Sequence, residues 1–157
     1  MMHNVYFKDI FQKRLAMQLS RFTDYTLRVL FYVATNDSRL ATLSEIAEYY
    51  DISIEHLRKV VHALSKSGYL DTYRGKNGGI KLAKATSDIN LADIVAQSEG
   101  QQPLINCGQQ MCRLTGFCSL QSALAEAQKS FVNVLEQYTL ADLLEKPEMR
   151  QELINTK

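Results

Sequence analysis

Residues 42–53 read Thr42-Leu-Ser-Glu-Ile-Ala-Glu-Tyr-Tyr-Asp-Ile-Ser53. Thr42 followed three positions later by Glu45 is a capping-box pattern, in which the two side chains bind free N–H groups at the start of a helix. The pattern predicts a short helix to about Tyr50 and then a tight turn, because Ser53 can cap a second helix. Two short helices joined by a tight turn form the core of a helix-turn-helix unit.

The second helix of this pair is predicted to run from Ser53 to about Ser67. Gly68 suits the left-handed residue that often follows a helix end. One side of the helix is apolar and the other is polar, as expected of a helix that packs on a core. The apolar stripe consists of Leu57, Val60, Val61 and Leu64.

The segments on either side extend this unit. Residues 23–36 are predicted to form a helix capped by Thr23, because apolar residues recur there at helical spacing. Downstream, two short alternating runs, 69–74 and 80–83, are joined by the glycine-rich residues 75–79, which predicts a β-hairpin. The expected fold class is mainly α with a small β-hairpin wing: a winged helix-turn-helix domain plus a long dimerisation helix.

Charge is distributed unevenly along the chain, whose net charge is +1. Residues 53–84 hold seven Lys and Arg against two acids, whereas residues 85–157 hold five against nine. A basic segment in a near-neutral chain predicts a surface that faces phosphates, although a solvated basic face is the alternative. The second helix is expected to reach base edges in the major groove, and the hairpin to contact the DNA backbone or minor groove. The residues predicted to bind DNA are Ser53, Glu55, His56, Arg58 and Lys59 on the helix, and Arg74, Lys76 and Lys81 on the hairpin.

A heptad pattern begins at Ser119. Apolar residues recur there at alternating spacings of four and three, which predicts a helix over residues 119–137 that pairs with a second copy of the chain. Thr139 can cap a last short helix over residues 140–145, which Pro147 ends. The predicted dimer seam consists of Leu120, Leu124, Ala127, Phe131, Val134 and Tyr138.

All three cysteines of the chain lie in one loop, with the spacing C-x4-C-x5-C. A disulfide framework would leave one thiol over, and an iron–sulfur cluster commonly has four ligands. The fourth ligand would come from elsewhere in the chain, from a partner chain or from a small molecule. Cys118 directly precedes a predicted helix start, where free N–H groups stabilise a thiolate. An iron–sulfur centre on Cys107, Cys112 and Cys118, a zinc site on the same cysteines, a thiol redox sensor and three inert thiols all remain open.

Composition bounds the remaining function classes. Hydrophobic residues make up 46% and charged residues 22% of the chain, as in ordinary soluble proteins. No apolar run is long enough to span a membrane, and residues 1–16 lack the apolar core of a signal peptide. We therefore expect a cytoplasmic protein with no membrane partner. No Ser/His/Asp set or pair of carboxylates stands out, so an enzyme is not expected.

Three stretches carry a family resemblance together with the cysteine spacing. They are Met17-Gln-Leu-Ser-Arg-Phe-Thr-Asp-Tyr25, Arg74-Gly-Lys-Asn-Gly-Gly-Ile-Lys-Leu82 and Tyr138-Thr-Leu-Ala-Asp-Leu-Leu144. Over residues 17–145 the chain resembles the Rrf2 family of bacterial repressors. The first cysteine gap, of four residues, is similar to that of the nitric-oxide-sensing members, whereas the iron–sulfur regulators have a longer gap. Iron-responsive members are the alternative.

The resemblance implies a homodimer that binds a palindromic double-stranded DNA operator and senses nitric oxide. Each subunit would hold an iron–sulfur cluster, [4Fe–4S] or else [2Fe–2S], on its three cysteines. The resemblance also implies that a carboxylate of the partner subunit supplies the fourth ligand, at the position of Asp24, with Arg28 nearby. Family proteins begin at the position of Met17, so residues 1–16 are expected to form an extension.

These predictions divide the chain into five parts. They are an N-terminal extension over residues 1–16, a winged helix-turn-helix domain over residues 17–100, a cysteine loop over residues 101–118, a dimerisation helix with a short C-terminal helix over residues 119–146, and a tail over residues 147–157.

Overall fold

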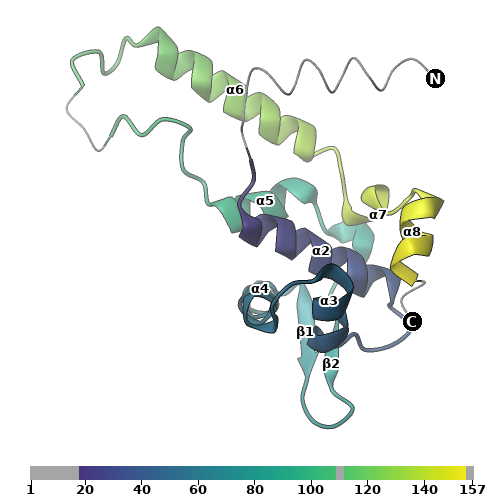
Figure 1. Cartoon of the computed structure of the whole chain (residues 1–157). Helices are drawn as coiled ribbons and strands as arrows, with labels where there is room; N and C mark the ends of the chain where they lie inside the picture. Colours follow the sequence, from purple (N-terminus) through teal and green to yellow (C-terminus); the bar gives the residue numbers. More distant parts are fainter. Residues whose placement is uncertain (1–17, 109–111, 155–157) are drawn as a thin grey trace.

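The computed structural model describes residues 18–108 and 112–154; the predicted N-terminal extension lies outside them. Figure 1 shows a mainly helical body with a two-stranded hairpin at one end and a long helix, α6, that stands out from the body. Within the described residues, no helix is long and apolar enough to cross a membrane. The winged helix-turn-helix architecture predicted from the sequence is confirmed.

Helix α2 (Arg21–Thr35) lies at the centre of the body and contacts α3, α4, α5, α8 and strand β2. It begins two residues earlier than predicted, because Ser20 is the N-cap and its hydroxyl accepts a hydrogen bond from the Thr23 N–H at 3.2 Å. The prediction that Thr23 caps the helix is therefore wrong. Thr23 is fully buried instead, within the first turn of the helix.

The helix-turn-helix consists of α3 (Leu43–Tyr50) and α4 (Ile54–Lys66). Their predicted caps are confirmed: Thr42 accepts from the Glu45 N–H, and Ser53 accepts from the His56 N–H. The turn between the helices depends on Asp51, whose φ of 52° places it in the left-handed region that aspartate tolerates. One apolar core joins α2, α3 and α4, so the orientation of the second helix is fixed by packing.

The wing consists of β1 (Leu70–Tyr73) and β2 (Gly79–Leu82), which pair antiparallel. Strand β2 also forms an isolated bridge with the segment before α3, where the Ile80 N–H donates to the Ala41 carbonyl at 2.7 Å. A Cβ atom at Gly79 would lie 2.7 Å from that same carbonyl oxygen. Only glycine lets the two backbones approach this closely, so the wing is held against the helix-turn-helix.

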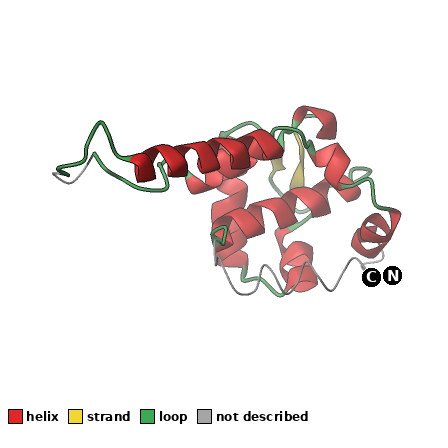
Figure 2. Ribbon diagram, turned by 90° about the horizontal axis from the view of Figure 1, so that it is seen from above, coloured by secondary structure: helices red, strands yellow, loops and turns green. Residues whose placement is uncertain are grey.

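Beyond the wing, a short 3-10 helix, η1 (Thr86–Asp88), leads into α5 (Leu91–Glu99), which Asn90 caps. Helix α6 (Ser119–Leu135) follows the cysteine loop, and α7 (Leu140–Leu143) follows α6. The end of α6 is fixed to the body by hydrogen bonds from Leu91 N–H to the Tyr138 carbonyl and from Leu140 N–H to the Ile89 carbonyl. Figure 2 shows the other end of α6, with its loop, projecting away from the body.

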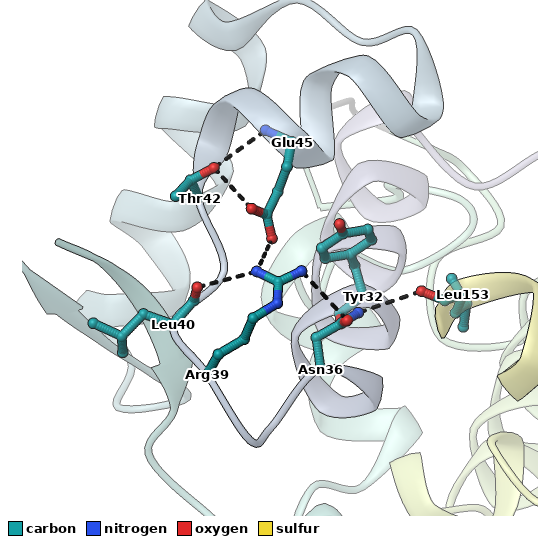
Figure 3. A network of polar contacts seen from close by, with 7 residues as sticks. All are labelled: Tyr32, Asn36, Arg39, Leu40, Thr42, Glu45 and Leu153. Carbon is teal, nitrogen blue, oxygen red and sulfur yellow. Dashed lines mark hydrogen bonds and ion pairs between the residues drawn. The ribbon is translucent and has the colours of Figure 1, made fainter. Parts of the chain in front are cut away.

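The described part of the chain ends in a helix, α8 (Pro147–Ile154), where the sequence predicts a tail. Pro147 begins this helix, where a missing N–H costs nothing. Leu153 is buried in the common core, and its carbonyl accepts from the Asn36 side chain at 3.3 Å. Figure 3 shows Asn36 joining this end of the chain to Arg39, which binds Glu45 of α3 at 2.5 Å. The C-terminal helix is thus part of the helix-turn-helix body.

Candidate DNA-binding surface and cysteine loop

The predicted reading residues lie on the exposed first turns of α4. Ser53, Glu55, His56, Arg58 and Lys59 are all exposed. The Ser53 hydroxyl lies 2.8 Å from His56 Nδ1, which fixes the imidazole near the helix start. Glu55 and Arg58 form an ion pair, so that arginine is partly neutralised in the free protein. Lys59 forms no ion pair with any described residue.

The wing places its cations on the surface. Arg74, Lys76 and Lys81 are exposed, and none of the ion pairs in the described part of the chain involves them. Strand β1 contacts α4, so the hairpin and the reading helix belong to one packed unit. Unpaired cations that protrude beside such a helix are suited to phosphate contact. The structure therefore brings the two groups of predicted DNA-binding residues onto neighbouring elements.

Sequence analysis missed one wing residue, Tyr73, which is 51% exposed beside Arg74. A tyrosine in a strand is as often a core residue as a surface one. Successive strand residues face opposite sides, so Leu70 and Tyr73 lie on opposite faces of β1. Leu70 is buried and Tyr73 is exposed, and this alternation was the signal available in the sequence.

The three cysteines lie in the segment that leaves α5 and returns to α6 (Figure 1). All three thiols are free; Cys112 is exposed, and Cys107 and Cys118 are half-buried. Cys118 occupies the N-cap position of α6 but makes no side-chain cap hydrogen bond. Its predicted place at a helix start is confirmed.

The loop is attached to α6 mainly by one glutamine. Gln128 accepts from the Leu104 N–H at 3.2 Å and donates to the Gln102 carbonyl at 3.0 Å. A cavity of about 310 Å³ lies between this part of the loop and α6, and Cys107 and Leu124 line it. The first cysteine is therefore placed beside the predicted dimer seam.

The described chain does not bring the three cysteines together as a formed metal site. No group of three His, Cys, Asp or Glu side chains in residues 18–108 and 112–154 lies close enough to hold a metal ion. The donor set nevertheless fits an iron–sulfur cluster, because three accessible thiols in one loop are the ligand type that such clusters use. Closure of the loop would be needed to bring them together.

Asp24 lies in the first turn of α2, and among the described residues it belongs to no group of three side chains that could hold a metal ion. Its carboxylate binds Arg28 Nε at 2.9 Å, and about half of each side chain is exposed. The Arg28 guanidinium also lies 5.3 Å from the centre of the Tyr50 ring. Burial raises the pKa of Tyr50, so the ring that Arg28 covers stays a neutral phenol. The candidate fourth ligand is thus accessible and held by one exposed ion pair.

The predicted dimer seam is uncovered in the single chain. No residue of α6 is buried, and Leu120 and Val134 are 55% and 53% exposed. A row of large apolar side chains exposed along one helix usually marks an interaction surface. The remaining seam residues are Leu124, Ala127, Phe131 and Tyr138, of which Leu124 alone is half-buried.

The capped helix pair with its basic wing defines a winged helix-turn-helix protein of the DNA-binding class. The family model of Rrf2, described as an iron-dependent transcriptional regulator, matches residues 19–146. The chain therefore belongs to the Rrf2 family and is a DNA-binding transcriptional regulator.

Solved structures agree with this assignment. IscR from T. potens is 27% identical in sequence to this chain. The match covers 83% of this chain and 88% of the IscR chain, and the two structures superpose with a TM-score of 0.69. CymR (YrzC), the global cysteine regulator of B. subtilis, is 22% identical over 81% of this chain and 95% of its own, with a TM-score of 0.67. The oxidized form of Staphylococcus aureus CymR is 23% identical over 83% and 98%, with a TM-score of 0.69.

Proposed function

We propose that this chain is a dimeric transcriptional repressor of the NsrR type, which holds an iron–sulfur cluster on Cys107, Cys112 and Cys118 and senses nitric oxide. The observation that carries the proposal is the position of the cysteines. Every thiol of the protein is free and lies in the one loop that joins α5 of the DNA-binding body to α6. The family description of iron dependence supports a metal at this loop.

The protein's own residues would couple the loop to DNA in a simple way. Helix α6 is fixed to the body at its C-terminal end, through the bridge between Asn90 and Thr139. At its N-terminal end the chain connects it to α5 through the cysteine loop, and the two helices also contact each other. When bound, the cluster supplies iron to which nitric oxide can bind. Thiols that hold a cluster keep the loop closed, whereas released thiols let that end of α6 move relative to α5.

Movement of α6 changes DNA binding only if α6 is the dimer element. With the seam paired to a second copy, the two α4 helices would meet successive major grooves of a palindromic operator. A change in the angle between each body and α6 then changes the spacing of the two reading helices. Operator affinity would fall because the protein binds best in the arrangement whose spacing matches the half-sites.

A fourth ligand from the partner would strengthen this coupling. The partner subunit's Asp24 would reach the cluster from the first turn of its own α2, the central helix of its DNA-binding body. A carboxylate oxygen is a harder ligand than thiolate and binds iron less tightly. We expect this bond to be the first one lost, so nitric oxide would act on the contact that joins the two subunits.

The test is anaerobic purification followed by an absorbance spectrum before and after nitric oxide. We expect a brown protein that loses operator affinity on nitrosylation, and colourless variants when Cys107, Cys112 or Cys118 is changed to Ala. Replacing the exposed Ser130, further along α6, by Ala is the control and should leave the spectrum unchanged. A colourless wild-type protein containing zinc, or a cysteine variant with full iron and sulfide, would contradict the assignment.

A regulator of the same family that responds to iron status is the second candidate. Its support is the iron-dependent description of the family and the 27% identity to T. potens IscR. Operator affinity separates the two candidates. A nitric-oxide sensor loses affinity when the intact cluster is nitrosylated, whereas an iron-status regulator changes affinity on iron removal and responds weakly to nitric oxide.

A further inference from the structure

The Glu99 carboxylate, which has no role in the proposed cluster site, connects the base of the cysteine loop to the start of α2. Glu99 is the last residue of α5, directly before the cysteine loop. Its Oε1 atom accepts a hydrogen bond from the Ser20 N–H at 2.6 Å and another from the Thr23 hydroxyl. Both donors belong to the start of α2, 76 or more residues away in the sequence. One oxygen atom therefore joins the end of α5 to the beginning of α2.

On the α2 side, this contact controls where Asp24 lies. Thr23 is fully buried and precedes Asp24 directly. Ser20 accepts the Asp24 N–H on its carbonyl at 3.1 Å, and its hydroxyl caps Thr23. The carboxylate of Glu99 thus binds the two residues that fix the backbone of Asp24. A hydrogen bond to an ionised acceptor is stronger than a neutral one.

On the α5 side, the contact lies at the base of the cysteine loop. Ile94 and Val95 are buried and keep α5 in the body, so Glu99 projects from a fixed helix. Gly100 follows with a φ of +79°, a conformation that turns the chain out of the helix into the loop. Any rearrangement that begins at Cys107 reaches the body first at this point.

The environment of Glu99 keeps it ionised at neutral pH. Burial raises the pKa of Glu99, but the hydrogen bonds from Thr23 and Ser20 outweigh burial and leave that pKa below its ordinary value. The carboxylate is consequently available as an acceptor for both donors.

We propose that Glu99 is a positioning residue, which holds Asp24 in register with the base of the cysteine loop of the same subunit. The inference rests on the proposed function, in which Asp24 ligates the partner's cluster. Each subunit then links its own loop, through Glu99, to the ligand that it gives to its partner. The two loops of a dimer become coupled, because a shift in one loop displaces a ligand of the other site.

The first experiment needs no cluster. In the metal-free protein, amide hydrogen exchange of residues 20–24 is measured by NMR for Glu99→Ala, Glu99→Gln and Gln97→Ala. Gln97 lies on α5 like Glu99, but it donates to the hydroxyl of Ser67 at the end of α4 and not to α2. It is therefore a matched control. We expect roughly tenfold faster exchange in Glu99→Ala, as for loss of a hydrogen bond to a charged group. Glu99→Gln, which keeps the acceptor oxygen, should stay near wild type. Equal exchange in Glu99→Ala and wild type would overturn the proposal.

The second experiment tests the coupling. Nitrosylation rates of the anaerobic, cluster-bound dimer should differ several-fold between Glu99→Ala and wild type, while Glu99→Gln and Gln97→Ala match wild type. If Gln97→Ala has the same effect as Glu99→Ala, general loosening of α5 explains the result and the positioning role is rejected. If wild type itself retains no cluster, the proposed function fails, and the exchange measurement alone decides whether Glu99 holds the start of α2.

Discussion

Asp24 is the residue whose structural and proposed roles differ most. In the single chain it starts a helix and forms an exposed i,i+4 pair with Arg28, an interaction worth only a few tenths of a kcal/mol. Such a weak pair is easily exchanged for another partner. Arg28 would still lie over Tyr50 after the exchange, so the body would keep its arrangement while the carboxylate binds elsewhere.

We therefore predict that Asp24→Ala leaves the dimer folded but alters the stability of the cluster or its response to nitric oxide. Unfolding by urea should change by less than about 1 kcal/mol, since only an exposed pair and a helix-start charge are lost. Asp93→Ala, which removes the first-turn acid of α5, is the matched control. Nitrosylation rate and operator affinity are the measurements, and wild-type values for both would make Asp24 only a helix-start residue.

Single residues also show where sequence reasoning ends. The sequence predicts Thr23 as the N-cap of the helix that contains Asp24. The structure uses Ser20, since Thr23 binds Glu99, a residue 76 positions away. By contrast, Thr42 and Ser53 cap the helices expected. Local caps were predictable because their partners are three residues distant, whereas the Thr23 contact depends on the tertiary fold.

Among the elements, α8 has the clearest consequence for stability. Leu153 is 4% exposed in the common core, whereas its neighbour Ile154 is 53% exposed. Tyr49 of α3 also donates to the Glu152 carbonyl at 3.4 Å. Helix α8 therefore supports the helix-turn-helix although it lies about one hundred residues further along the chain.

Leu153→Ala should lower the free energy of unfolding by about 2–3 kcal/mol, the lower part of the range for buried leucines, because a terminal helix can adjust. Ile154→Ala should change it by less than about 0.5 kcal/mol, as expected for an exposed position. Urea titration followed by circular dichroism measures both. Equal effects of the two substitutions would show that α8 does not dock on the body in solution.

The wing gives a prediction of a different kind. Arg74 and Lys76 are exposed and unpaired among the described residues, so we expect them to contact phosphates. Replacing either by Ala should weaken binding to operator and non-operator DNA alike, and should reduce the slope of log K against log salt by about one. Lys146→Ala, an exposed cation after α7, is the control. Unchanged slopes in both wing variants would exclude the wing as a contact surface.

The predicted helices are found where the spacing of apolar residues and a capping residue agree. Helix α8 is not predicted from the sequence. After a helix, proline usually predicts the end of helical structure, and Pro147 follows the predicted last helix. Proline is equally suited to the first position of a new helix, and α8 is only weakly amphipathic. The sequence therefore offered no strong pattern for it, and its position became evident only through Leu153 and Asn36.

At the scale of the whole molecule, we predict that the uncovered face of α6 pairs with a second copy of the chain. Phe131→Glu would place a charge in the predicted seam, and like charges would face each other in a paired helix. We expect this variant to be monomeric by light scattering at micromolar concentration, whereas Ser130→Glu, one residue outside the seam, stays dimeric. A dimeric Phe131→Glu protein with normal operator affinity would move the interface elsewhere.

The seam could be predicted from the sequence because its spacing is local. Convergence of the three thiols could not, because it depends on loop closure and on a ligand proposed to come from another chain. The described residues place Cys107, Cys112 and Cys118 in one loop. Which atoms complete their coordination is a property of the assembly.

Because one face of α6 is uncovered in the single chain, DNA binding by this protein is also expected to depend on its concentration. A lone subunit exposes an apolar strip and presents one reading helix, so it can occupy only half of a palindrome. Occupancy of the operator then varies with the square of the subunit concentration below the dimer dissociation constant, and linearly above it. For the proposed dimeric repressor, halving the copy number in that lower range would reduce operator occupancy about fourfold, without any chemical signal at the cysteine loop.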